Sequence, residues 1–375
     1  MTPSRSTQVR VLAALALALL LAGCAAPTKT EAPKPQPVFY PLPPDPARIQ
    51  HLATFERARD VGTARSGFAD FVLGDEKAGE ALVRPYGAAL FEGKLHVADS
   101  RAPGIATFDL VGRKFSVFSG SAGGRMQRPI NVTIDTDGTK FVTDTGRNQV
   151  LVYDRNDRFV ASFGEKGEFK PVDTAIAGDT LYVVDIEHHE VRALDKRTGK
   201  PKFKFGKPGS EEGALYHPTN MAIGPDGDLY VVETGNFRVS RFTASGKFVR
   251  SYGEAGQTHG RFARPKGIAI DRTGRLYVGD AAFQNVQVFD GGGRVLMAFG
   301  QPGEGQQGLN LPAGVSIDYD NVALFRPLAA PDFTIEYLIL VVSQFGPNKV
   351  DVFGFGKKRG VTYPPDEKPA AKAGG

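Results

Sequence analysis

Cysteine is almost absent from this sequence, because Cys24 is the only one among 375 residues. This excludes a disulfide framework in the body of the chain and a catalytic pair of cysteine and histidine. Charged residues make up only 23%, whereas 45 glycines and 26 prolines interrupt the chain, a composition typical of a turn-rich globular protein. The apolar run from Val11 to Ala22 is too short to span a bilayer as a helix.

The N-terminal residues have the order of an export signal. Arg5 and Arg10 precede the apolar run, so residues 1–23 are predicted to be a signal peptide. The run ends in Leu21-Ala22-Gly23-Cys24, which resembles the lipobox of bacterial lipoproteins. The resemblance implies cleavage before Cys24 and acylation of its thiol. Because residue 25 is alanine and not aspartate, it favours the outer membrane, at its periplasmic face or at the cell surface.

Two polar segments flank the body of the chain. Residues 24–47 are expected to form a lipidated cysteine and a stiff tether, since residues 25–46 contain eight prolines. Residues 358–375 are expected to be a disordered tail. Removal of residues 1–23 would leave 44 basic against 41 acidic residues, a formal charge of +3. This balance argues against a nucleic-acid partner, and export would also separate the protein from nucleic acid.

A motif that opens on proline recurs six times between these segments. The prolines are spaced 44, 42, 47, 47 and 47 residues apart, at Pro85, Pro129, Pro171, Pro218, Pro265 and Pro312. After each proline the sequence predicts four short strands, as in "GIAID", "LYVGD", "NVQVFD" and "VLMAFG" of residues 267–300. A period of 40 to 50 residues made of strands, without the 3.6-residue periodicity of helices, is typical of propeller blades.

The last repeat lacks its fourth strand, and this predicts how the ring closes. The repeat ends with "KVDVFGFG", while the alternating segment Arg48 to Glu56 has no blade of its own. We expect this segment to complete blade six and thereby to remove an unpaired sheet edge. The fold class is therefore all-β, a six-bladed β-propeller over residues 48–357 whose ring is closed by an N-terminal strand. Blade six also has an apolar insertion at residues 319–336, predicted either to pack under the ring or to form a contact surface.

The blade pattern, with "RPKGIAID", "GRLYVGD" and "NVQVFD", resembles the NHL repeat. Together with the lipobox and the proline-rich segment, the chain is similar to bacterial six-bladed NHL-repeat lipoproteins. The resemblance covers about four-fifths of the chain and implies the propeller fold. It implies little about function, because propellers carry many unrelated activities.

Charged residues recur with the blades. The residue before the opening proline is basic in five blades, and the second predicted strand ends in an acid: these positions are Arg84, Arg128, Lys170, His217 and Arg264, and Asp99, Asp144, Asp185, Glu233 and Asp280. Both sets are expected at the face where the loops between blades lie. They form either a charged ring that binds a ligand or structural ion pairs that tie loops to neighbouring blades.

A candidate metal site follows from a second set of positions. Two residues after the proline, three adjacent blades have Asn131, Asp173 and Asn220, whose oxygens are of the kind that Ca²⁺ needs. Asn and Asp at a strand start also suit local turn hydrogen bonds. Elsewhere, His188 and His189 share one loop, but a zinc site takes three or four ligands.

Two functions remain open from the sequence. The first is a lipid-anchored, non-catalytic platform that binds or assembles envelope or secreted proteins and needs no cofactor. The second is a Ca²⁺-dependent lactonase or other hydrolase with its site at the mouth of the propeller channel. Such a calcium enzyme should gain stability from the metal, whereas the platform should not.

Overall fold

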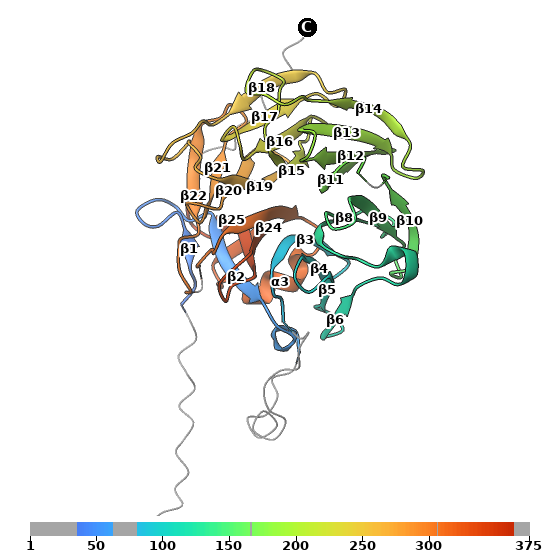
Figure 1. The fold of residues 1–375 in the computed structure, drawn as a ribbon. Coiled ribbons are helices and arrows are strands. Elements are labelled where there is room, and N and C mark those ends of the chain that lie inside the picture. Colours follow the sequence, from blue (N-terminus) through green and yellow to red (C-terminus); the bar gives the residue numbers. More distant parts are fainter. Residues whose placement is uncertain (1–35, 63–80, 166, 306, 364–375) are drawn as a thin grey trace, which may run out of the picture. The chain divides into compact units, whose positions relative to one another are not determined.

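A computed structural model describes residues 36–62, 81–165, 167–305 and 307–363 of the chain (Figure 1). Residues Pro37–Gly375 form one compact unit. The predicted signal peptide and Cys24 lie outside the described residues. The described residues contain no helix that is both long and apolar enough to cross a membrane.

Six antiparallel sheets make up the compact unit, one for each predicted repeat. Blade 1 consists of β3 (Pro85–Phe91), β4 (Lys94–Asp99), β5 (Gly104–Asp109) and β6 (Lys114–Phe118). Blade 2 consists of β7 (Pro129–Ile134), β8 (Lys140–Asp144), β9 (Gln149–Tyr153) and β10 (Phe159–Phe163). Blade 3 consists of β11 (Pro171–Ala177), β12 (Thr180–Asp185), β13 (Glu190–Asp195) and β14 (Pro201–Phe205).

The remaining blades follow the same order until the last one. Blade 4 consists of β15 (Pro218–Ile223), β16 (Leu229–Glu233), β17 (Arg238–Phe242) and β18 (Phe248–Tyr252). Blade 5 consists of β19 (Pro265–Ile270), β20 (Leu276–Asp280), β21 (Asn285–Phe289) and β22 (Val295–Phe299). Blade 6 combines β23 (Pro312–Asp318), β24 (Phe333–Ser343) and β25 (Val350–Lys358) with β2 (Ile49–Phe55) and β1 (Phe39–Tyr40).

Burial across a blade explains its sequence pattern. The second strand lies between two other strands and two neighbouring blades, so all five residues of β20 are buried. This is why it reads as an apolar run without alternation. The outer strand β22 is largely accessible, with only Phe299 buried. The innermost strands contact one another in the order β3, β7, β11, β15, β19 and β23, and β23 returns to β3, which closes the ring.

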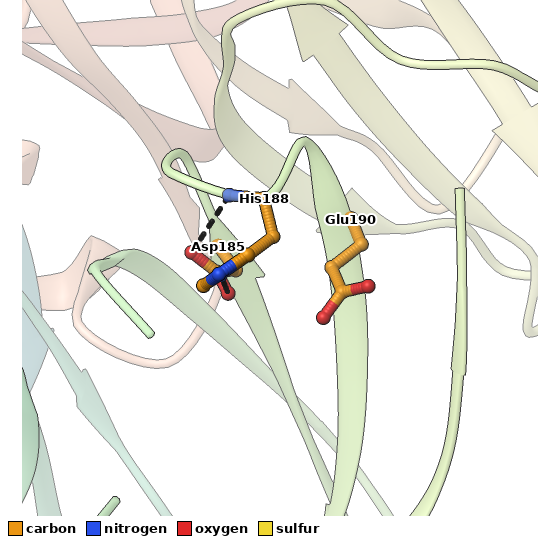
Figure 2. A group of neighbouring side chains, drawn as sticks. All are labelled: Asp185, His188 and Glu190. Atoms are coloured by element: carbon orange, nitrogen blue, oxygen red, sulfur yellow. Dashed lines mark hydrogen bonds and ion pairs between the residues drawn. The ribbon is translucent and has the colours of Figure 1, made fainter. Parts of the chain in front are cut away.

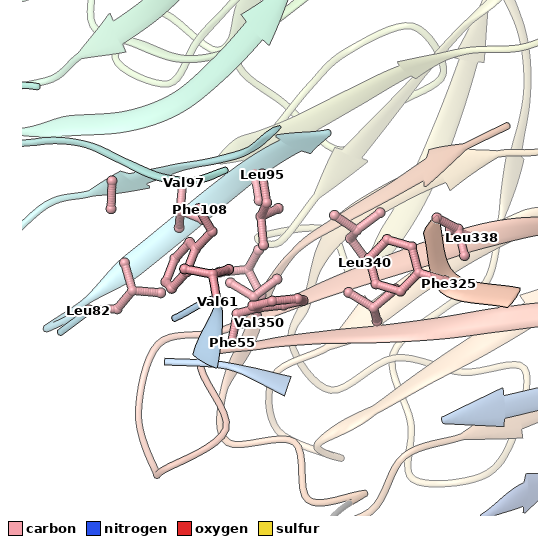
Figure 3. Close-up of a cluster of buried hydrophobic side chains, with 14 of the residues drawn as sticks. Phe55, Val61, Leu82, Leu95, Val97, Phe108, Phe325, Leu338, Leu340 and Val350 are labelled. Atoms are coloured by element: carbon pink, nitrogen blue, oxygen red, sulfur yellow. The ribbon is translucent and has the colours of Figure 1, made fainter. Parts of the chain in front are cut away.

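The predicted closure by the N-terminal strand is confirmed. β2 pairs antiparallel with β25 from Ile49 opposite Phe355 to Phe55 opposite Val350. Phe55 also joins a buried apolar cluster with Phe108 of blade 1 and Leu340 of blade 6 (Figure 3). Residues separated by most of the chain therefore share one core at the seam of the ring.

The ordered body extends beyond both ends of the range predicted for the propeller. Residues 24–47 were predicted to be a tether, but Phe39 and Tyr40 form β1 against Ile49 and Gln50. Tyr40 is buried and donates a hydrogen bond to Gln307 Oε1 at 2.6 Å. The aromatic rings of Phe39 and Tyr40 pack against Phe333 of blade 6 and Phe299 of blade 5. At the other end, Lys358 belongs to β25, and the backbone N–H of Lys358 donates a hydrogen bond to the Tyr363 hydroxyl.

The insertion of blade six is shorter than the predicted range 319–336, because β24 already begins at Phe333. It contains the one-turn helix α3 (Val322–Phe325) and the 3₁₀ turn η3 (Arg326–Leu328). Val322 and Phe325 are buried in the apolar cluster that contains Phe55, whereas the side chains of Leu324 and Leu328 are exposed. The insertion thus packs mainly against the ring. Two further 3₁₀ turns are η1 (Ala58–Asp60) and η2 (Ala122–Gly124).

Candidate functional site

The six innermost strands surround a central channel with a cavity of about 310 Å³. In every blade the pairing of the first two strands is irregular next to the opening proline, as between Pro129 and Asn131 in blade 2. Such bulges re-aim side chains at the end of a strand. The polar side chains that line the cavity are those of Asn131, Thr133, Asp173, Thr174, Asn220 and Ser316, and the other lining residues are glycines and apolar residues.

These three residues lie together, as their sequence positions predicted. Asn131 Nδ2 donates a short hydrogen bond to Asp173 Oδ1. Asn220 lines the same cavity, and its amide nitrogen donates to the Lys266 carbonyl oxygen at 3.2 Å. Asp173 is buried, and burial raises its pKa to about 7, although backbone and amide donors act in the opposite direction. The channel therefore contains a buried acid that titrates near neutrality.

The carboxylate and amide oxygens of Asp173 and Asn131 accept hydrogen bonds from the protein. Asp173 Oδ1 accepts the Thr174 N–H at 2.8 Å as well as the Asn131 amide, and Oδ2 accepts the Met221 N–H at 2.7 Å. Asn131 Oδ1 accepts the Val132 N–H at 2.8 Å. Calcium takes six to eight oxygen ligands. Here one carboxylate is available, and both of its oxygens already serve protein donors.

A glycine in the next blade makes room for Asn131. A Cβ atom at Gly87 would lie 1.8 Å from Asn131 Oδ1, a separation that no real side chain tolerates. At Gly314 of blade 6, a Cβ atom would lie 2.5 Å from the Tyr86 carbonyl oxygen. Glycine at this position lets the strands approach closely on one side of the channel, while amide and carboxyl groups fill the other side.

The periodic acids are buried, and their partners are mainly backbone amides. Asp144 accepts the N–H groups of Gln127 at 2.6 Å, Arg128 at 2.9 Å, Gly146 at 2.9 Å and Arg147 at 3.1 Å. Asp99 and Asp280 bind the corresponding four N–H groups in blades 1 and 5. Each acid thus connects the loop before the opening proline to the loop between the second and third strands of the blade.

The acids of blades 3 and 4 combine this role with side-chain partners. Asp185 accepts the Lys170 N–H at 3.0 Å, and Glu233 accepts the Tyr216 N–H at 3.0 Å. Their carboxylates also bind arginines of their own blades: Arg192 Nε lies 3.1 Å from Asp185, and Arg238 Nε lies 2.7 Å from Glu233. In blade 6, Ser343 takes the place of the acid and accepts the Asn310 N–H at 3.1 Å.

The predicted side-chain pairing of acids with the preceding basic residues is absent from the described part of the chain. The acids bind the backbone of Arg84, Arg128, Lys170 and Arg264, and the side chains of these residues are left at the surface or partly buried. His217 differs, because its N–H donates to His189 Nδ1 at 2.8 Å. A carboxylate at the end of a strand next to a tight loop is well placed for local N–H groups. The position of each acid, at the end of a strand and before a short loop, could have indicated this role from the sequence.

One of the acids belongs to a cluster with metal-binding residue types. The side chains of Asp185, His188 and Glu190 meet in blade 3 (Figure 2), with His188 Nδ1 2.7 Å from Asp185 Oδ2. Both acids are already neutralised by cations. Arg192 contacts Asp185 and Glu190, and Lys204 lies 2.9 Å from Glu190. We therefore interpret this cluster as a structural ion-pair network.

Sequence reasoning missed Lys266 as a site residue. Lys266 follows the opening proline of blade 5, and its ammonium nitrogen lies 5.0 Å from the centre of the Tyr86 ring in blade 1. Burial, and then the charges of Arg264 and Arg84, lower the pKa of Lys266 to about 8. The other blades have Tyr, Ile, Val, Thr or Ala after the opening proline, so a single lysine at this position was the only feature of the sequence that could have indicated the site.

No protein-family model matches the chain. Solved structures are similar to it over most of its length. Virginiamycin B lyase from Staphylococcus aureus has 14% identity and a TM-score of 0.51, covering 72% of this chain and 80% of that one. A gluconolactonase from Xanthomonas campestris has 15% identity and a TM-score of 0.52, covering 86% and 98%. A chain of the nidogen–laminin complex has 16% identity and a TM-score of 0.52, covering 72% and 97%.

At this level of identity the comparisons establish the fold, and they agree with the six sheets described above. The three similar structures are a lyase, a lactonase and a component of a protein complex. The chain is therefore an all-β six-bladed propeller whose architecture is shared by enzymes and by binding proteins.

Proposed function

We propose that this chain is a lipid-anchored, non-catalytic platform that binds envelope or secreted proteins. Binding would use the face that holds the loops between blades and between the second and third strands, here called the loop face. The Leu21-Ala22-Gly23-Cys24 sequence supports the lipid anchor and an outer-membrane location. The resemblance of the blades to NHL repeats fits a repeat domain in such a lipoprotein.

The construction of the loop face is the observation that carries this proposal. Five buried acids fix its loops by hydrogen bonds to backbone N–H groups, so the face is pre-organised. Basic side chains remain accessible on it, together with Tyr216 and Phe345, which are 43% and 44% exposed. Arginine and large aromatic residues are the types that contribute most to protein interfaces, and rigidity lowers the cost of binding.

A site-specific photo-crosslinker tests the platform directly. It would replace Phe345 on the loop face or, as a control, Phe203 on the outer strand β14, which is 38% exposed. We expect a discrete protein adduct from position 345 in intact cells of the source bacterium and none from position 203. Identical adducts from both positions, or none from position 345, would contradict a loop-face platform.

The anchor has its own test. Cys24→Ser should abolish incorporation of labelled palmitate and release the protein from the outer-membrane fraction, since an acyl anchor requires this thiol. Retention of label in the variant would refute the assignment of Cys24.

Calcium separates the platform from the alternative enzyme. The contacts of Asp173 lead us to expect the same thermal midpoint after chelation and in millimolar Ca²⁺. A rise of several degrees with calcium, lost in Asp173→Ala, would instead favour the Ca²⁺-dependent lactonase or hydrolase, because a metal stabilises the state that binds it.

A further inference from the structure

Lys266 is a partly buried cation without an acidic partner among the described residues. It lies at the start of β19, and its ammonium group reaches past blade 6 to the Tyr86 ring of blade 1 at 5.0 Å. A ring face stabilises a cation only partly, whereas taking an ammonium group out of water costs several kcal/mol. The position thus holds a charge that an incoming anion would neutralise.

Two arginines increase this positive charge. Arg84 and Arg264 are close enough to Lys266 to lower its pKa further, in addition to the effect of burial. Asp99 and Asp280 are the buried acids of the same blades, and each accepts four backbone N–H groups, including those of Arg84 and Arg264. Lys266 is therefore within electrostatic reach of both arginines, while the nearby carboxylates are directed at the backbone.

The surroundings of this cluster fit a protein segment. The guanidinium of Arg84 lies 4.8 Å from the centre of the Phe345 ring, which is exposed. A peptide could place a carboxylate at Lys266 and an apolar group against Phe345 at the same time. An isolated inorganic anion would leave the aromatic surface unused.

We infer that Arg84, Arg264 and Lys266, above Tyr86, form a binding site for a carboxylate on an acidic segment of a partner protein. The inference rests on the proposed function and specifies the chemistry that the loop face recognises. The site ends at the channel mouth, because the carboxyl group of Asp173 lies close enough to Tyr86 to raise the pKa of its hydroxyl further, after the effect of burial. Once Asp173 is ionised, above its pKa of about 7, it would repel a second anionic group deeper in the channel.

The probe that tests the inference is an acetylated, amidated hexaglutamate peptide, compared with hexaglutamine and with inorganic phosphate. We expect the chain isolated from cells to bind hexaglutamate by calorimetry in low salt, and not to bind hexaglutamine. Lys266→Met should weaken this affinity at least tenfold. The matched control is Lys94→Met, because Lys94 is an exposed lysine at the start of β4, the end of that strand away from the loop face.

The pH dependence distinguishes Lys266 from general attraction to surface charge. From pH 7 to pH 9 the protonated fraction of Lys266, whose pKa is about 8, falls roughly tenfold, while Asp173, whose pKa is about 7, becomes ionised. The affinity for hexaglutamate should therefore fall at least about tenfold over this range, and Lys266→Arg separates the contribution of Lys266 from that of Asp173. Surface lysines and arginines remain charged over this range. Lys266→Arg should bind the peptide at both pH values, because guanidinium does not titrate there.

The inference is overturned if hexaglutamine binds as tightly as hexaglutamate, if phosphate alone binds as tightly as the peptide, or if Lys266→Met and Lys94→Met behave alike. These results are separable from failure of the platform. Adducts at position 345 that persist in Lys266→Met would keep the platform and remove the carboxylate site. Loss of all adducts together with intact hexaglutamate binding would keep the carboxylate site and remove the platform.

Discussion

Acids and bases recur with the same period on one face of this propeller, yet they have opposite roles. The acids Asp99, Asp144, Asp185, Glu233 and Asp280 are buried and accept hydrogen bonds from the loops. The basic residues before the prolines contribute mainly their backbone to these bonds and leave their side chains available. Periodicity in a repeat protein therefore does not separate residues with buried, structural side chains from residues with accessible side chains, because both follow the blade.

The largest expected effect comes from removing an acid. Asp144→Ala leaves four backbone N–H groups without their acceptor. Unsatisfied buried groups cost about 1–3 kcal/mol each, and water that enters the space offsets part of this, so we expect a loss of about 3–5 kcal/mol in the free energy of unfolding by urea. Arg128→Ala in the same blade should change it by less than about 0.5 kcal/mol. Equal losses would remove the distinction between the two sets.

Asp173 sharpens the comparison, since it is a buried acid that does not join loops. Its pKa is raised to about 7 from a usual value of 3.8. Between these values the folded state binds more protons than the unfolded state, so this group makes stability fall as pH rises from 3.8 to 7. Asp173→Asn should abolish this part of the pH profile, about 1–3 kcal/mol in urea unfolding at successive pH values. An unchanged profile would show that Asp173 is ionised throughout.

Lys266→Met should stabilise the protein, in contrast to the substitution of a buried acid. The pKa of Lys266 is lowered from 10.5 to about 8, so the cost of its buried charge is complete below pH 8 and disappears above pH 10.5. We expect Lys266→Met to gain about 1–2 kcal/mol over the original chain at pH 7, and the difference to shrink as pH rises through this window. A destabilised Lys266→Met at pH 7 would indicate that the ammonium has a stabilising partner in the fold.

Much of the fold could be predicted from the sequence because each blade repeats a local pattern. The turn-rich spacing placed the innermost strand of every blade at its proline, and the orphan segment from Arg48 to Glu56 predicted the closure of blade six. β1 was missed because prolines around Phe39 and Tyr40 concealed a strand that is stabilised by distant partners, among them Gln307.

The site was less predictable because side-chain direction depends on tertiary contacts. The sequence placed Asn131, Asp173 and Asn220 together but could not show that the oxygens of Asn131 and Asp173 accept protein N–H groups. It also paired the acids with basic side chains rather than with the backbone. Lys266 could not be recognised as a site residue from the sequence, because its neighbours Arg84, Arg264 and Tyr86 come from two different blades.

The pairing of β2 with β25 has a consequence for biogenesis. Ile49 and Phe355 are partners across the seam, so β2, made near the beginning of the chain, must wait for β25, the last described strand, to be synthesised. Until then its edge and the apolar surface of Phe55 have no partner, a state that favours aggregation. Contacts of such long sequence separation also slow folding. Loss of the C-terminal strand β25 by premature termination would leave the ring open.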